Sequence, residues 1–163
     1  MVDSVWRRLL HRAGPRHLPP MTDDPDLHLV VNGERVGVAE QRGSVRVFRL
    51  LCRPESVVIA SRDAVPAELG LARDPRSLGV ALQHIAVRQG AQFEVLKAND
   101  PRLVDGFHDY EATDDLRWTN GYAALPAGVF ARLQSGGVEI VLTLAGATRY
   151  LDDGKSMAAV AAA

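Results

Sequence analysis

Residues 27–38 read LHLVVNGERVGV and carry the strongest hairpin signal in the chain. Apolar side chains alternate from Leu27 to Val31, which is the two-residue period of a strand that buries one face. Asn32-Gly33 follows, and this dipeptide is preferred at the centre of a type I′ turn. Residues 34–38 supply the return strand. The sequence therefore predicts that a β domain begins here with an antiparallel hairpin.

Six further segments have strand character, at residues 45–51, 56–61, 78–88, 92–96, 118–125 and 138–144. The last has the cleanest alternation. The longest, residues 78–88, changes phase, because Val80 and Leu82 share one face while Ile85 and Val87 fall on the other. One extra residue would restore the face, so the pattern predicts a β-bulge near Gln83-His84.

About eight short strands with turn signals between them, and no long amphipathic helix, are typical of an all-β domain. The expected architecture is an antiparallel β-sandwich, jelly-roll-like, with a closed barrel as the alternative. Residues 97–117 are polar and are expected to be irregular.

Outside this domain the sequence changes character. Residues 4–13 predict a short N-terminal helix that begins at Ser4 and ends at Gly14-Pro15. We assign residues 1–25 to this helix and a proline-rich linker, residues 26–150 to the β-sandwich domain, and residues 151–163 to a flexible tail.

The composition is that of an ordinary globular protein, with 47% hydrophobic and 24% charged residues among 163. A formal net charge of −1 gives no pull toward nucleic acid. No stretch reaches the roughly 20 apolar residues of a membrane span. The N-terminus lacks the apolar core of a signal peptide, so the expected compartment is the cytoplasm, or the outside by export without a classical signal peptide.

The single cysteine, Cys52, follows an apolar run and is expected to be an inert core thiol. No histidine pair has metal-ligand spacing, and the common catalytic and cofactor motifs are absent from the sequence, so we expect no metal and no cofactor.

The long connection at residues 61–80 contains the first candidate binding residues, Arg62 and Arg76. An arginine fork can bind a carboxylate, a phosphate or sugar hydroxyls. The alternative is structural, since a long loop needs internal ion pairs and hydrogen bonds to hold its shape.

The second candidate region, residues 106–121, contributes His108, Glu111 and Trp118. Aromatic rings next to hydrogen-bonding groups suit the apolar and polar faces of a sugar. Its acidic residues are also of the type that binds calcium. The structural alternative is a loop that buries its aromatic rings and leaves its acids in water.

These segments together resemble the β domain found beside Hint (hedgehog/intein-type) domains in bacterial proteins, and small β-sandwich modules attached to bacterial glycosyltransferases. The matching segments are DDPDLHL (23–29), SRDAVPAE (61–68), RSLGV (76–80), GFHDYE (106–111), RWTNG (117–121) and ALP (124–126). The resemblance implies a bacterial accessory module. Hint self-cleavage needs an N-terminal Cys or Ser nucleophile and a His-Asn pair; Cys52 is internal and no His-Asn dipeptide occurs, so that chemistry does not carry over.

The sequence thus predicts a non-catalytic accessory module that binds carbohydrate or a partner protein, through Arg62, Arg76, His108, Glu111 and Trp118. One alternative is a hydrolase that uses His108 with Glu111 or Asp109. Another is a purely structural domain. Exposed strand edges also make a homo-oligomer one of the expected partnerships.

Overall fold

A computed structural model describes residues 19–154. These residues divide into two units, one of residues 22–150 and one that includes residues 19–21 and 151–154. The strands are β1 (Met21–Thr22), β2 (His28–Val31), β3 (Glu34–Val36), β4 (Glu40–Arg42), β5 (Val45–Leu50), β6 (Val57–Ala60), β7 (Val80–Gln89), β8 (Gln92–Lys97), β9 (Phe107–Glu111), β10 (Leu116–Thr119), β11 (Tyr122–Ala124), β12 (Val138–Ala147) and β13 (Tyr150–Leu151). Two short helices, α2 (Pro66–Leu69) and the 3-10 helix η1 (Ala127–Phe130), lie between strands.

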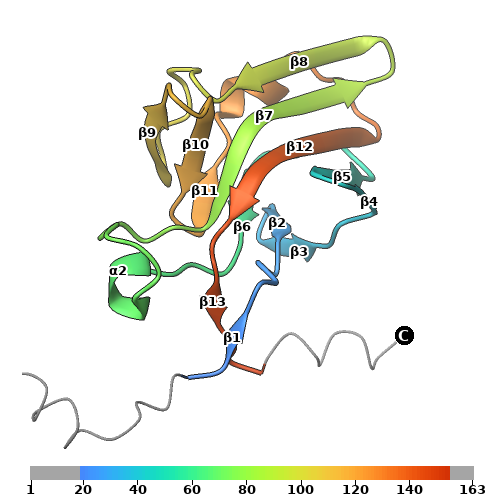
Figure 1. The fold of residues 1–163 in the computed structure, drawn as a ribbon. Coiled ribbons are helices and arrows are strands. Elements are labelled where there is room, and N and C mark those ends of the chain that lie inside the picture. The colour runs from blue at the N-terminus through green and yellow to red at the C-terminus, as the bar shows by residue number, and fades with distance from the viewer. Residues whose placement is uncertain (1–18, 155–163) are drawn as a thin grey trace, which may run out of the picture. The chain divides into compact units, whose positions relative to one another are not determined.

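Strands β2 to β12 form two antiparallel sheets (Figure 1). The larger has the order β4-β5-β12-β7-β10-β9, with β8 also paired to β7. The smaller has the order β11-β6-β2-β3. Strands β1 and β13 pair separately as a two-stranded sheet. Strand β7 is long enough to pair with β12 along one edge and with both β8 and β10 along the other.

The predicted hairpin forms as β2 and β3. Val31 lies opposite Glu34, which leaves Asn32 and Gly33 as a two-residue turn. Both have positive φ, at 51° and 88°, as a type I′ turn requires. The Asn32 side-chain oxygen also accepts hydrogen bonds from two backbone N–H groups just before β6. The turn therefore fixes both the hairpin and its neighbouring strand.

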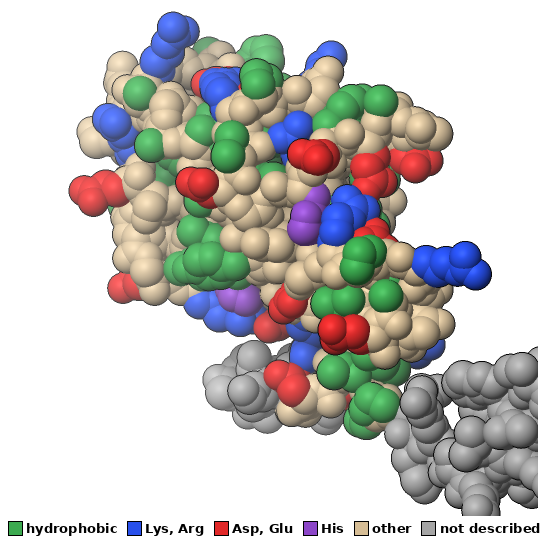
Figure 2. All heavy atoms as spheres, turned by 90° about the vertical axis from the view of Figure 1, so that its left-hand side faces the viewer, with side chains coloured by type: hydrophobic (Ala, Val, Ile, Leu, Met, Phe, Trp, Pro, Cys, Tyr) green, Lys and Arg blue, Asp and Glu red, His purple; other side chains and the backbone are tan. Residues whose placement is uncertain are grey.

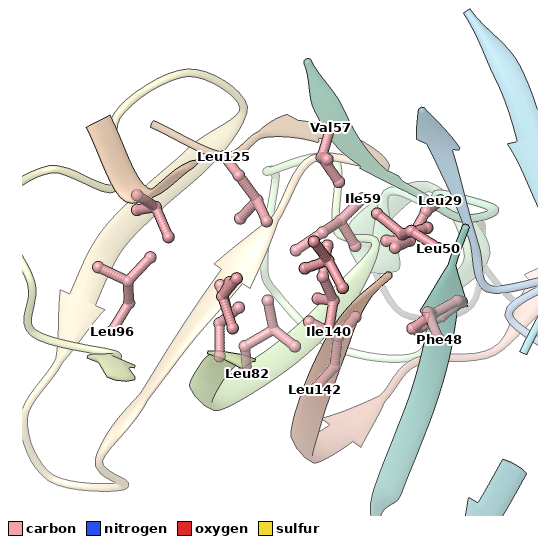
Figure 3. Packing of buried hydrophobic residues seen from close by; sticks show 14 of the residues in the cluster. Leu29, Phe48, Leu50, Val57, Ile59, Leu82, Leu96, Leu125, Ile140 and Leu142 are labelled. Atoms are coloured by element: carbon pink, nitrogen blue, oxygen red, sulfur yellow. The ribbon is translucent and has the colours of Figure 1, made fainter. Parts of the chain in front are cut away.

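The core lies between the two sheets (Figure 3). Leu29 and Ile59 of the smaller sheet pack with Phe48, Ile140 and Leu142 of the larger one, and all five are fully buried. Burial alternates along β12, as the sequence predicted. The all-β antiparallel sandwich is thus confirmed, and the two sheets are separate within residues 19–154 and do not close into a barrel.

The predicted bulge is also present. Leu82 pairs with Leu144 and His84 pairs with Thr143, which are adjacent on β12, so Gln83 is the extra, unpaired residue of a β-bulge on β7. This extra residue lets Leu82 and Ile85 both face the core, where each is at most 1% exposed. The change of phase in the hydrophobic pattern of the sequence therefore predicted the position of the bulge correctly.

Several expectations differ from the structure. Residues 97–117, expected to be irregular, contain β9 and the start of β10, which pair as a hairpin. The single strand expected at 118–125 is divided at Asn120-Gly121 between the larger and the smaller sheet. The structure also has more strands than the eight expected, because many are only two to four residues long.

Cys52, expected in the core, is exposed. The chain leaves β5 after Leu50, so Leu51 is already 95% exposed and the next residue follows it outward. The expected helix at 4–13 and residues 155–163 of the expected tail lie outside the described residues, while Leu151, the first residue of that tail, belongs to β13. Met21–Thr22, inside the predicted linker, forms β1.

Candidate functional site

Three of the predicted site residues, Arg76, Glu111 and His108, lie where the 61–79 connection contacts β9. Nη2 of Arg76 is 2.7 Å from Oδ2 of Asp74 and 2.7 Å from Oε1 of Glu111. Nε of Arg76 donates a further hydrogen bond to Oδ1 of Asp74 at 3.0 Å. We call Asp74, Arg76 and Glu111 the Arg76 cluster. Its guanidinium faces two carboxylates, so the fork is occupied by the protein's own acids.

The electrostatics of the Arg76 cluster follow from this pairing. The hydrogen bond from the Arg76 side chain, with one from its backbone N–H, lowers the pKa of Asp74 to about 2. The same contacts with Asp74 and Glu111 raise the pKa of Arg76 above its ordinary value. Asp74 and Arg76 are therefore both charged across the physiological range, as suits an ion pair.

His108 of β9 binds the same connection one residue further along, at Ser77. Its Nε2 donates to the backbone oxygen of Ser77 at 2.6 Å. The hydroxyl of Ser77 in turn donates to Oδ2 of Asp63. Because the carbonyl oxygen can only accept, Nε2 carries the proton and is not free to act as a base. His108 and the Arg76 cluster together hold the long connection against β9.

The other two predicted site residues, Trp118 and Arg62, do not belong to the Arg76 cluster. Trp118 lies on β10 opposite Ala81 and is half-buried. It shares a sheet face with Glu111, since Leu116 pairs with Glu111 and lies two residues before it. The backbone N–H of Arg62 donates to the oxygen of Pro25 at 2.7 Å.

Figure 2 is viewed from the side of β9 and α2. It shows that acidic, basic and histidine side chains are mixed on this face and do not form a patch of one charge.

A groove lies elsewhere, between the β7–β8 hairpin and η1. Its volume is about 560 Å³, which falls within the range of small-molecule sites. We call it the η1 groove. It is lined by Val87, Ala91, Gln92, Phe93, Glu94, Arg102, Gly128, Val129, Arg132 and Leu133.

Phe93 and Arg132 distinguish the η1 groove. Phe93 is 76% exposed, the most exposed aromatic side chain among residues 19–154. Arg102 is held by Glu94 and Asp100, at 2.6 and 2.9 Å. Arg132 is exposed and, within the described part of the chain, has no ion pair or hydrogen bond. The lining of the groove thus includes an exposed aromatic residue and an available cation.

Two smaller grooves adjoin it around the tip of the hairpin. The tip groove, of about 430 Å³, lies between residues 89–92 and 134–137. The β12 groove, of about 300 Å³, includes Arg49, Arg88 and Glu139 in its lining. The side chain of Gln89 joins the two walls, because its Nε2 donates to the oxygens of Gln134 and Gly137 at 3.0 and 3.3 Å.

No protein-family model, curated protein or solved structure matches this chain. The resemblance to Hint-associated modules therefore stays a prediction. None of the helices within residues 19–154 is both long and apolar enough to cross a membrane. In the same range, no three His, Cys, Asp or Glu side chains gather as a metal site requires.

Sequence reasoning placed residues 92–96 in a strand but did not select Phe93. A signal for its exposure was present. Leu96 faces the core, so the alternation puts Phe93 and Val95 on the opposite face. For Arg132 no such signal exists, since its position in the groove depends on how the segment after η1 folds back against β8.

Proposed function

We propose that this chain is a non-catalytic accessory module and that the η1 groove binds carbohydrate. The observation that carries the proposal is the ring of Phe93, exposed at the rim of a groove that also holds the unpaired Arg132. Leaving a phenylalanine side chain exposed costs about 1.5–3 kcal/mol of the free energy that its burial would give, and a ligand that stacks on the ring can recover part of it. We propose that this ligand is a sugar.

Sugar rings have an apolar face that stacks on an aromatic ring and a rim of hydroxyls that need donors and acceptors. Phe93 supplies the ring. Gln92, Glu94 and Arg132 line the same groove and supply both kinds of polar group. A mixed lining of this type favours a sugar over a purely apolar ligand.

The Arg76 cluster supports a binding module rather than the alternative hydrolase. A hydrolase would need Glu111 and His108 to be available for proton exchange with a substrate. Here Oε1 of Glu111 is paired with Arg76, and Nε2 of His108 is bound to the Ser77 carbonyl, so only Nδ1 of that ring is left as a possible base. These groups serve the fold of the connection, which leaves the η1 groove as the better candidate for a ligand.

A glycan-array screen of the purified protein, with and without calcium, tests the proposal. We expect selective binding that Phe93→Ala abolishes and Arg132→Gln weakens. Val95→Ala and Arg73→Gln are the matched controls, because Val95 lies two residues along the same strand and Arg73 is an exposed arginine outside the grooves. Thermal melting confirms that each variant is folded.

Three results would contradict the proposal. An array without binding in either condition would indicate that the ligand is a partner protein and not a carbohydrate. Binding that survives Phe93→Ala but disappears in Trp118→Ala or His108→Ala would place the ligand at the β9–β10 face instead. Turnover of a glycan, lost in His108→Ala, would establish the hydrolase alternative.

A further inference from the structure

The three grooves around the β7–β8 tip share their walls. Gln92 and Ala91 line both the η1 groove and the tip groove, while Gln89, Gly90 and Gly137 line both the tip groove and the β12 groove. Because they share lining residues, the three grooves lie side by side, and we call them together the trough. The trough is therefore longer than a single ligand site, and Gln89 bridges its walls midway.

A row of side chains joins the two ends of this trough. Phe93 lies opposite Arg88, Arg88 lies opposite Glu139, and Glu139 lies opposite Arg49. Directly opposed residues share a sheet face, so the four side chains stand in line across β8, β7, β12 and β5. Phe93 lines the η1 groove and the other three line the β12 groove.

The trough has a charge opposite in sign to the whole chain. Its lining contains four arginines and two glutamates, whereas the chain has a net charge of −1. Glu139 forms ion pairs with both Arg49 and Arg88, and Arg49 is also paired with Glu40 at 3.2 Å. Both arginine side chains are about 60% exposed, and exposed ion pairs are weak enough to exchange partners for a ligand anion. This favours a ligand that carries repeated negative charge.

From these observations we infer that the ligand is a linear acidic polysaccharide that runs from the η1 groove, over the hairpin tip, to the β12 groove. The inference rests on the proposed function and adds the ligand's length and charge. One sugar ring stacks on Phe93 beside Arg132. Carboxylates of residues further along the chain pair with Arg88 and Arg49, and the glutamines of the tip groove face its hydroxyls.

Calorimetric titration with galacturonate oligosaccharides and their carboxyl-reduced counterparts tests this. The hexasaccharide should bind at least about tenfold more tightly than the disaccharide, and added salt should weaken it. Carboxyl reduction should remove most of that gain. Arg49→Gln should weaken hexasaccharide binding severalfold and leave disaccharide binding unchanged, because β7 and β12 separate Arg49 from Phe93. Arg88→Gln, directly opposite Phe93, should also weaken hexasaccharide binding, and Arg73→Gln is the control.

The outcomes separate the two proposals. If short neutral sugars bind as tightly as the acidic hexasaccharide, and Phe93→Ala abolishes that binding, the inference is overturned while the proposed function stands. If no sugar binds, both fail. If poly-glutamate binds with the same sensitivity to Arg88→Gln while sugars do not, the trough binds an acidic peptide, and the polysaccharide inference is overturned.

Discussion

Phe93 of β8 lies directly opposite Arg88 of β7, and both side chains point away from the core with most of their surface exposed. This pair connects the η1 groove to the β12 groove. Neither residue stabilises the core, because the buried residues of the two strands are their neighbours in the alternation. Both positions are therefore available for a ligand without loss of the fold.

Replacing Arg76 with Gln should destabilise the protein by about 1 kcal/mol, because the pairs it makes are partly exposed and screened. Its hydrogen bond lowers the pKa of Asp74 from 3.8 to about 2. A lowered carboxyl pKa gives stability that is present above the ordinary value and is lost as the pH falls to about 2.

Urea unfolding between pH 5 and pH 2 measures this effect. The wild type should lose stability steeply between about pH 4 and pH 2. In Arg76→Gln the part of that loss due to Asp74 should be smaller. Identical pH profiles for the two proteins would show that the Arg76 cluster does not stabilise the fold.

Tyr150 is fully buried, and its hydroxyl donates to the backbone oxygen of Gly79 at 2.7 Å. Tyr150→Phe should cost about 1–2 kcal/mol, because it leaves that oxygen without a partner. Burial also raises the pKa of Tyr150 from 10.0 to about 12.

A tyrosine with a raised pKa gives stability that is complete below about pH 10 and is lost as the pH rises to about 12. The full loss amounts to about 2–3 kcal/mol. Chemical unfolding across this range should show the loss in the wild type and a smaller one in Tyr150→Phe. An equal loss in both proteins would refute the assignment to Tyr150.

Gly79 has no room for a side chain. A Cβ at this position would lie 2.5 Å from Oγ1 of Thr119 and 2.6 Å from the backbone N of Gly121. Gly79→Ala should therefore force the connection away from β10 and lower stability by about 1–3 kcal/mol. Gly37→Ala is the control, since a Cβ there meets nothing within 4 Å. Equal melting temperatures for the two variants would contradict this.

Exposed Cys52 should react with a thiol reagent in the folded protein, at a rate that does not depend on unfolding. Labelling with and without mild denaturant measures this. A rate that rises steeply only in the unfolding transition would show that the thiol is buried.

Most of the sandwich could be predicted from the sequence, because hydrophobic period is a local property. The alternation in residues 138–144 located β12, and Asn32-Gly33 located the first turn. Even the bulge at Gln83 followed from a phase change within one strand.

The predictions that were wrong concern segments whose structure depends on contacts with distant parts of the chain. The β9–β10 hairpin is polar along its sequence, and it is stable because β10 also pairs with β7. Cys52 follows an apolar run that ends one residue sooner than its composition suggests. No local pattern marks these two outcomes.

The candidate site was predicted only in part. Arg76, His108 and Glu111 do meet, but Asp74 completes an ion-pair network that the sequence offered only as the structural alternative. The η1 groove joins β8 to a segment about forty residues later in the chain. Its residues come together only in the folded sandwich.

The central claim is that the η1 groove binds carbohydrate, and the most direct measurement is glycan binding by Phe93→Ala beside Val95→Ala. We predict that Val95→Ala keeps the binding of the wild type and that Phe93→Ala loses it, with equal melting temperatures. Binding that is the same in both variants, or absent from all three proteins, would contradict the account.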